Sequence, residues 1–203
     1  MQRNSSPKVI NMLALLFFMS GISALIYQIA WQRLLFSTLG SDIESVTIIV
    51  SVFMLGLGIG ALVGGRMVDF FPNLAVLLFA FAEIGIGIFG FFSRSIILGA
   101  GNYFYSDSSL VTACISFAII LLPTMLMGAT LPILVSFVAK KLANVGAATG
   151  HMYSFNTLGA AIGAFATGWW LFGAFTLTES IHLAAAINIG VAFFALIFLR
   201  GEK

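Results

Sequence analysis

Residues 55–65 read LGLGIGALVGG and residues 158–168 read LGAAIGAFATG, so one pattern of small and apolar residues occurs twice. The two stretches agree at Leu55/Leu158, Gly56/Gly159, Ile59/Ile162, Gly60/Gly163, Ala61/Ala164 and Gly65/Gly168. Glycines four residues apart lie along one face of a helix. In a bilayer such faces let helix backbones approach closely. The sequence therefore predicts helix-packing stripes, made of Gly56, Gly60, Gly64, Gly159 and Gly163.

The composition around these stretches is that of a membrane protein. Of the 203 residues, 61% are hydrophobic and 8% are charged, whereas about a quarter of the residues of a soluble domain carry charge. Apolar runs of about 20 residues, enough to cross a bilayer, occur at 9–31, 43–65, 73–92, 110–138, 152–172 and 177–199. We therefore expect an all-α membrane protein, with residues 1–203 forming a single domain of six transmembrane helices.

A second correspondence extends the repeat to the third and sixth runs. AEIGIGIF, from Ala82, aligns with INIGVAFF, from Ile187, and places Glu83 opposite Asn188. When three helices are repeated once, the second copy crosses the membrane in the opposite direction, as in the inverted repeats of many transporters. The expected architecture is a 3+3 inverted repeat.

The basic residues predict the orientation, because Lys and Arg in short loops stay on the cytoplasmic side. Of the nine Lys and Arg residues, two, Arg33 and Arg94, fall on one side of the six predicted spans. The others are Arg3, Lys8, Arg66, Lys140, Lys141, Arg200 and Lys203, on the side that holds both termini. We expect a multi-pass protein of the cytoplasmic (inner) membrane with both termini in the cytoplasm. The net charge of +2 gives no reason to expect a nucleic-acid partner.

Glu83 is the one acidic residue placed in the middle of a predicted span. A carboxylate at the bilayer centre costs about 2.5–3.5 kcal/mol on insertion scales, so such residues usually face a bundle interior or a water-filled cavity. Gly87 and Gly90 share its helical face, which indicates a neighbouring helix. Two hypotheses follow: Glu83 binds a cation or relays protons, or it is a neutral carboxyl that is hydrogen-bonded to a partner helix.

The other candidate solute-binding residues are Tyr27, Gln28, Trp31, Asn156 and Asn188. Tyr and Gln can hydrogen-bond an amine, and Trp can bind it by cation–π contact. The alternative for Tyr27 and Trp31 is an aromatic anchor at the outer membrane interface. For Asn156 and Asn188 the structural alternative is a hydrogen bond between helices.

We expect no metal, no cofactor and no catalytic residue. His151 and His182 fall near opposite membrane surfaces, and the one cysteine, Cys114, stands alone. The glycines of LGLGIGALVGG lie inside a span and do not follow a strand, as a dinucleotide-binding fingerprint requires.

Several phrases together resemble a known family: SGISALIYQIAWQRLL, FMLGLGIGALVGGRMVD, LLPTMLMGATLPIL and HMYSFNTLGAAIGAFATGWWLF. They are similar to the membrane domain of the prokaryotic fused spermidine-synthase-like proteins, which is itself similar to one six-helix half of a major facilitator transporter. In that family a soluble aminopropyltransferase domain follows the membrane domain. No residue of its catalytic site can be placed here, so we expect the chain to be no enzyme by itself, with a separately encoded catalytic partner as an option.

Two functions follow from the residues and the resemblance. In the first, the chain binds or transports a small, cationic, polyamine-like solute in the lipid bilayer, with a homodimer expected because facilitator-like transporters place the site between two six-helix halves. In the second, it is a membrane anchor or assembly subunit that packs against another protein subunit without transport.

Overall fold

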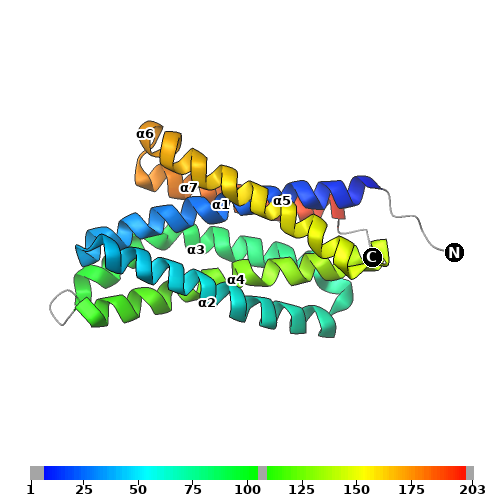
Figure 1. Cartoon of the computed structure of the whole chain (residues 1–203), viewed down its shortest axis with the longest axis horizontal. Helices are drawn as coiled ribbons and strands as arrows, with labels where there is room; N and C mark the ends of the chain where they lie inside the picture. The colour runs from blue at the N-terminus through cyan, green and yellow to red at the C-terminus, as the bar shows by residue number, and fades with distance from the viewer. Residues whose placement is uncertain (1–6, 105–108, 200–203) are drawn as a thin grey trace.

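The computed structural model describes residues 7–104 and 109–199, and this part of the chain contains helices and no strand. Six long helices lie side by side (Figure 1). They are α1 (Pro7–Leu39), α2 (Asp42–Phe70), α3 (Ala75–Phe104), α4 (Ser109–Leu142), α5 (Val145–Ala166) and α7 (Leu177–Leu199). Between them lie a 3₁₀ turn, η1 (Pro72–Leu74), a π-helical turn, η2 (Thr167–Leu171), and the short helix α6 (Phe172–Ala174).

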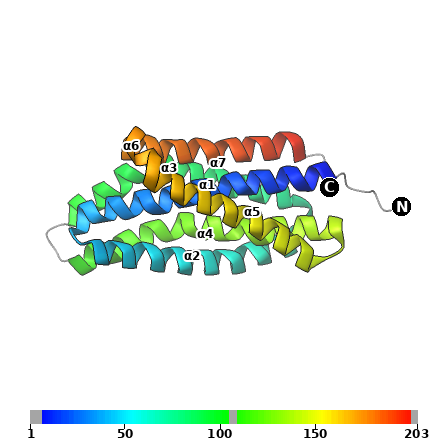
Figure 2. The same cartoon turned by 45° about the horizontal axis from the view of Figure 1, so that its top comes forward.

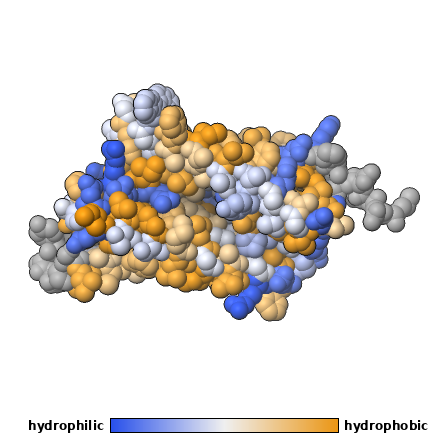
Figure 3. All heavy atoms as spheres, viewed as in Figure 1, coloured by the Kyte–Doolittle hydropathy of each residue, from blue (hydrophilic) through white to orange (hydrophobic). Residues whose placement is uncertain are grey.

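All six long helices are long and apolar enough to cross a membrane, the fifth span including η2 and α6. The prediction of an all-helical protein with six apolar helices is therefore confirmed. Hydrophilic residues gather toward the two ends of the molecule, and apolar residues dominate the middle (Figure 3). This distribution suits a multi-pass protein whose middle is surrounded by lipid.

Most helices extend beyond the apolar runs that predicted them. The first continues eight residues past Trp31 to Leu39, and the third continues past residue 92 to Phe104. The fifth begins at Val145 instead of residue 152. A helix can continue beyond its apolar run, because polar side chains at its ends lie outside the apolar middle of the span and are solvated by water. Only the last helix, α7, has the predicted bounds of 177–199.

The helices pack in preferred pairs. The most extensive contacts join α2 to α4 and α1 to α5, followed by α3 to α7 and α3 to α4. Two views show α2 beside α4 and α5 crossing α1 (Figures 1 and 2). The beginning of α1 and the end of α7 lie at the same end of the bundle, and the α1–α2 connection lies at the opposite end (Figure 2).

The two closest pairs meet at the predicted glycines. A methyl group added to Gly60 would collide with the backbone oxygen of Met125 on α4, and one added to Gly159 would collide with that of Phe18 on α1. The further contacts of this kind join Gly56 to Thr124, Gly64 to Ala129 and Gly163 to Ile22. Small residues thus permit backbone-to-backbone contact between membrane helices.

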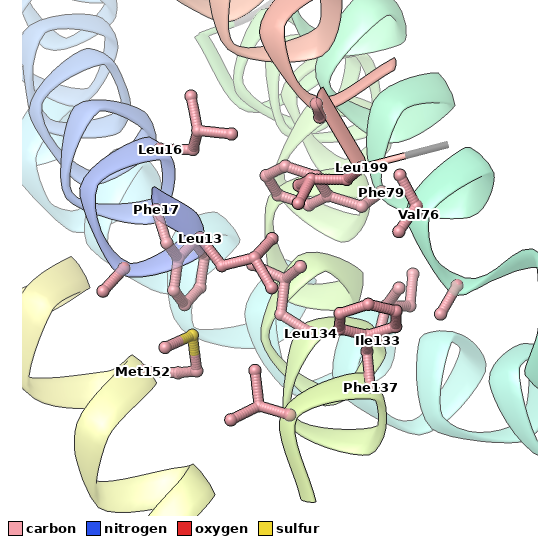
Figure 4. Packing of buried hydrophobic residues seen from close by; sticks show 14 of the residues in the cluster. Leu13, Leu16, Phe17, Val76, Phe79, Ile133, Leu134, Phe137, Met152 and Leu199 are labelled. Carbon is pink, nitrogen blue, oxygen red and sulfur yellow. The ribbon is translucent and has the colours of Figure 1, made fainter. Parts of the chain in front are cut away.

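The interior consists of two apolar clusters. The cluster nearer the beginning of α1 contains Leu13, Phe17, Phe79, Leu134 and Met152, contributed by four helices (Figure 4). Phe17 and Phe79 meet edge to face, with ring centroids 6.4 Å apart. The second cluster, toward the α1–α2 connection, contains Tyr27 and Trp31.

Candidate functional site

Glu83 lies where α1, α3 and α7 meet. It is completely buried, with an exposed fraction of 0%. The Ser20 hydroxyl on α1 donates a 2.6 Å hydrogen bond to its Oε1, and Asn188 Nδ2 on α7 donates a 2.6 Å hydrogen bond to its Oε2. One acidic side chain therefore connects three transmembrane helices through buried polar contacts. Protein groups, rather than lipid, surround this carboxyl.

The register of α1 and α3 brings these groups together. Ser20 faces Glu83, Tyr27 lies against Gly90, and Trp31 bonds to Ser93. The offset along the chain is 63 residues at Ser20–Glu83 and 62 at Trp31–Ser93, so the two helices run parallel. Gly90 provides the room for the Tyr27 ring, since a methyl group there would overlap the tyrosine hydroxyl.

The third helix also has a fixed register against α7. Gly87, one turn beyond Glu83, meets Ile189 and the backbone of Ala185. Further along, the rings of Phe91 and His182 stack with centroids 4.4 Å apart. Positions on α3 rise as those on α7 fall, so the two helices are antiparallel. The face that Glu83 shares with Gly87 and Gly90 is thus fully occupied by α7 and α1.

Tyr27 and Trp31 belong to the buried core near the carboxyl. Both side chains have an exposed fraction of 0%, and their rings stack with centroids 4.8 Å apart. Trp31 Nε1 donates a 2.9 Å hydrogen bond to the Ser93 hydroxyl. The alternative of an aromatic anchor facing lipid therefore does not apply to either residue. The exposed indoles at that end of the bundle are Trp169 and Trp170 on η2.

Two buried polar atoms in this region have no hydrogen-bond partner: the Tyr27 hydroxyl and Asn188 Oδ1. The Tyr27 hydroxyl lies against Gly90, two helical turns beyond Glu83 on α3. Buried polar groups are nearly always paired, and each exception requires an explanation. The Glu83 carboxyl and the unpaired acceptor of Asn188 belong to bonded neighbours, and such groups can bind a polar ligand or water.

The remaining candidates lie elsewhere. Asn156 Nδ2 donates a 3.0 Å hydrogen bond to the backbone oxygen of Phe17, so it joins α5 to α1. Gln28 is partly buried on α1. The structure therefore brings Asn188 to Glu83, buries Tyr27 and Trp31 two to three helical turns further along α3, and uses Asn156 in a different helix contact.

Sequence reasoning did not identify Ser20 or Ser93. Both are buried serines on helices that also carry predicted candidates. Ser20 precedes Tyr27 by two helical turns, which places it on the same face. That spacing was the available signal, but it did not show which residue of another helix Ser20 would meet.

Within the described residues, no group of three or more His, Cys, Asp or Glu side chains could hold a metal ion. His151 and His182 lie on different helices, and each meets a phenylalanine ring. Cys114 is exposed on α4.

Comparison with known proteins shows a similarity over nearly the whole chain. The chain is 25% identical over 200 residues to a polyamine aminopropyltransferase of Oceanobacillus iheyensis. The match covers 97% of this chain and 38% of the relative, so the chain spans less than half of that protein's length. No family model matches the chain, and no solved structure matches it.

This similarity corrects one prediction. We expected the chain to be no enzyme, because no aminopropyltransferase domain follows its last helix. The relative that matches nearly the whole chain is named as an aminopropyltransferase, so the comparison contradicts that expectation. The position at which the sequence ends carries no information about catalysis.

Proposed function

We propose that this chain is a multi-pass membrane module that binds a small, cationic, polyamine-like solute beside Glu83. The observation that carries the proposal is the carboxyl itself, enclosed by α1, α3 and α7 and bonded to Asn188, whose Oδ1 has no partner. Intramembrane acids are functional candidates because burying them is costly. The class of solute is supported by the name of the relative, which is a polyamine aminopropyltransferase.

The chemistry of the region suits a protonated amine. An ammonium group has several N–H donors and no acceptor. Glu83 offers carboxylate oxygens, and Asn188 Oδ1 offers an acceptor that no described protein group uses. The stacked rings of Tyr27 and Trp31 add aromatic surface that attracts cations. An amine bound here would exchange its hydration shell for these groups.

Because Glu83 is fully enclosed, a solute must enter through movement of the helices around it. The proposed plan for that movement is a 3+3 inverted repeat resembling half of a major facilitator transporter. The packing supports it, because the pair α2–α4 has a counterpart in α5–α1. Gly128 on α4 meets Leu57 on α2, and Gly21 on α1 meets Ala160 on α5. Leu57 and Ala160 occupy matching positions of the repeated pattern.

The proposed location is the inner membrane with both termini in the cytoplasm. The support is the distribution of basic residues over the described helices. Lys8, Arg66, Lys140 and Lys141 lie at the bundle end where α1 begins, whereas Arg33 lies near the other end of α1. Such an excess of basic residues characterises the cytoplasmic side.

A second function, assembly with another protein subunit or a second copy, is favoured by α5. The span that contains it has the lowest mean hydropathy of the six, 1.2 against 2.2–2.5 for the others. Consistent with this low hydropathy, its outward face exposes the polar residues Tyr153, Ser154 and Thr157. A helix that faced only lipid would be expected to be the most apolar.

The test is equilibrium binding of spermidine to the full chain in lipid nanodiscs, with Glu83→Gln as the variant. We expect Glu83→Gln to weaken binding by more than about tenfold, because a buried charge partner is lost. Glu44→Gln, which removes an exposed carboxylate from α2, should bind as the unchanged chain does. If the unchanged chain binds no spermidine, or if Glu83→Gln binds it equally well, the proposal is wrong and assembly is the better account.

A further inference from the structure

The bundle also has a half-open surface cavity far from Glu83, lined in part by charged residues. It has a volume of about 510 Å³ and is lined by Gln32, Arg33, Phe36 and Asp42. Three of these residues lie on the last turns of α1, and Asp42 is the first residue of α2. The cavity therefore opens at the end of the bundle that holds the α1–α2 connection, where a membrane interface would lie.

The cavity presents a cation and an anion that are not paired with each other. Arg33 and Asp42 both line it, yet among the described residues neither forms an ion pair or side-chain hydrogen bond. The Arg33 guanidinium instead lies 4.3 Å from the centroid of the Phe172 ring. This stacking positions the guanidinium and leaves its N–H groups free for a ligand.

The individual positions of these charges have ordinary explanations. Asp42 lies in the first turn of α2, where a carboxylate stabilises the helix dipole. Arg33 near a membrane interface can extend toward water. Both side chains are exposed, so water can solvate the two charges in place of an ion pair. A ligand that carries both charges would satisfy both residues.

We propose that this cavity binds a zwitterionic phosphoethanolamine group. Arg33 pairs with the phosphate, for which a guanidinium fork is well suited. Asp42 and the amide oxygen of Gln32 accept hydrogen bonds from the primary ammonium. The Phe36 ring contacts the aliphatic part of the ligand.

Two sources share this chemistry: the headgroup of phosphatidylethanolamine and free phosphoethanolamine. The surroundings suit a lipid, because Phe36, which lines the cavity, and Ile43, the residue after Asp42, are both exposed and apolar. Trp169 and Trp170 are exposed on η2, and indoles are enriched at membrane interfaces. The site is independent of the proposed function, because none of its lining residues takes part in the Glu83 cluster.

The test is calorimetric titration of the delipidated full chain with short-chain phosphatidylethanolamine, phosphatidylglycerol and phosphatidylcholine. We expect phosphatidylethanolamine to bind about tenfold more tightly than the other two, because only it offers both a phosphate and an N–H donor. Free phosphoethanolamine is then added as a competitor. Competition identifies the soluble zwitterion as a further ligand, and tight lipid binding without competition identifies the lipid as the ligand; both support the site.

Substitutions of Arg33 and Asp42 test the contribution of each charge to binding. Arg33→Gln should weaken phosphatidylethanolamine, phosphatidylglycerol and phosphatidylcholine alike by about tenfold, because all three carry the phosphate. Asp42→Asn should weaken phosphatidylethanolamine alone. Arg94→Gln, an exposed arginine that does not line the cavity, and Glu83→Gln should leave binding unchanged. Equal binding of the three lipids by the unchanged chain, or no effect of Arg33→Gln, overturns the proposal.

Discussion

Asn188 on α7 and Glu83 on α3, which lie 105 residues apart in the sequence, are joined by a buried 2.6 Å hydrogen bond. The bond connects the two positions that pair when AEIGIGIF is aligned with INIGVAFF. Because Ser20 binds the other carboxyl oxygen, the stability of the bundle and the chemistry of the site depend on the same side chain.

Glu83→Gln and Glu83→Ala should differ in stability. The glutamine keeps an acceptor for Ser20, and its NH₂ group can donate to Asn188 Oδ1 once that amide turns, so we expect a change within about 1 kcal/mol. The alanine leaves Ser20 and Asn188 without their partner and opens a cavity, which should cost about 2–4 kcal/mol. Thermal unfolding of both variants in the same detergent measures the difference. Equal unfolding temperatures for the two would show that the hydrogen bonds contribute little.

Tyr27→Phe should separate folding from ligand binding. The hydroxyl is buried without a partner, so its removal should leave stability unchanged or raise it by up to about 1 kcal/mol. If the hydroxyl contacts the bound amine, spermidine affinity should fall by about fivefold. Tyr153→Phe on the exposed face of α5 is the matched control for both measurements. A large loss of stability in Tyr27→Phe would mean that the hydroxyl is paired after all.

Ser93→Ala should destabilise the bundle through Trp31. It removes the acceptor of the Trp31 indole N–H and leaves a buried donor unpaired, at a cost of about 1–3 kcal/mol. Ser95→Ala, on an exposed position of the same helix, should change stability by less than about 0.5 kcal/mol. Chemical or thermal unfolding, followed by Trp fluorescence, measures both. A neutral Ser93→Ala would indicate that the indole finds another partner.

Each glycine stripe lies on a helix that also carries a glycine facing open space, so a contacting and a non-contacting position can be compared on the same helix. Gly60→Ala and Gly159→Ala each place a methyl group against backbone of a neighbouring helix, so each should cost about 1–3 kcal/mol through overpacking. Gly58→Ala on α2 and Gly150→Ala on α5 point into open space. They should be neutral or slightly stabilising, because alanine favours a helix. Unfolding temperatures that do not separate the two pairs would show that the helix contacts are looser than described.

Some boundaries that composition missed had recognisable local signals. Gly40 follows Leu39 with a positive φ of 71°, which is the usual residue after a helix end. The Asn144 side chain caps α5 by accepting a 2.9 Å hydrogen bond from the backbone N–H of Ala147. At α7, whose bounds composition did predict, Thr176 and Glu179 form a reciprocal capping pair. These caps define helix ends, whereas apolar runs define only the part of a helix that crosses the lipid.

The candidate site was predictable only in part. Helical periodicity placed Gly87 and Gly90 on the face of Glu83, and the repeat selected Asn188. Neither pattern predicts the register of α1 against α3, because that register depends on how the side chains of different helices pack together. Ser20 was therefore missed, and Tyr27 and Trp31 were left open between an amine site and an interfacial anchor. The packing of their rings against Gly90, Ser93 and Phe89 decides their burial.

The central claim is that an amine binds directly at the Glu83 carboxyl. The most direct measurement is an infrared difference spectrum of the full chain in nanodiscs, recorded with and without spermidine, for the unchanged chain and for Glu83→Gln. Our account predicts that spermidine changes a carboxyl band of the unchanged chain and that this change is absent from Glu83→Gln. The same carboxyl change in both proteins, or none in either, would contradict it.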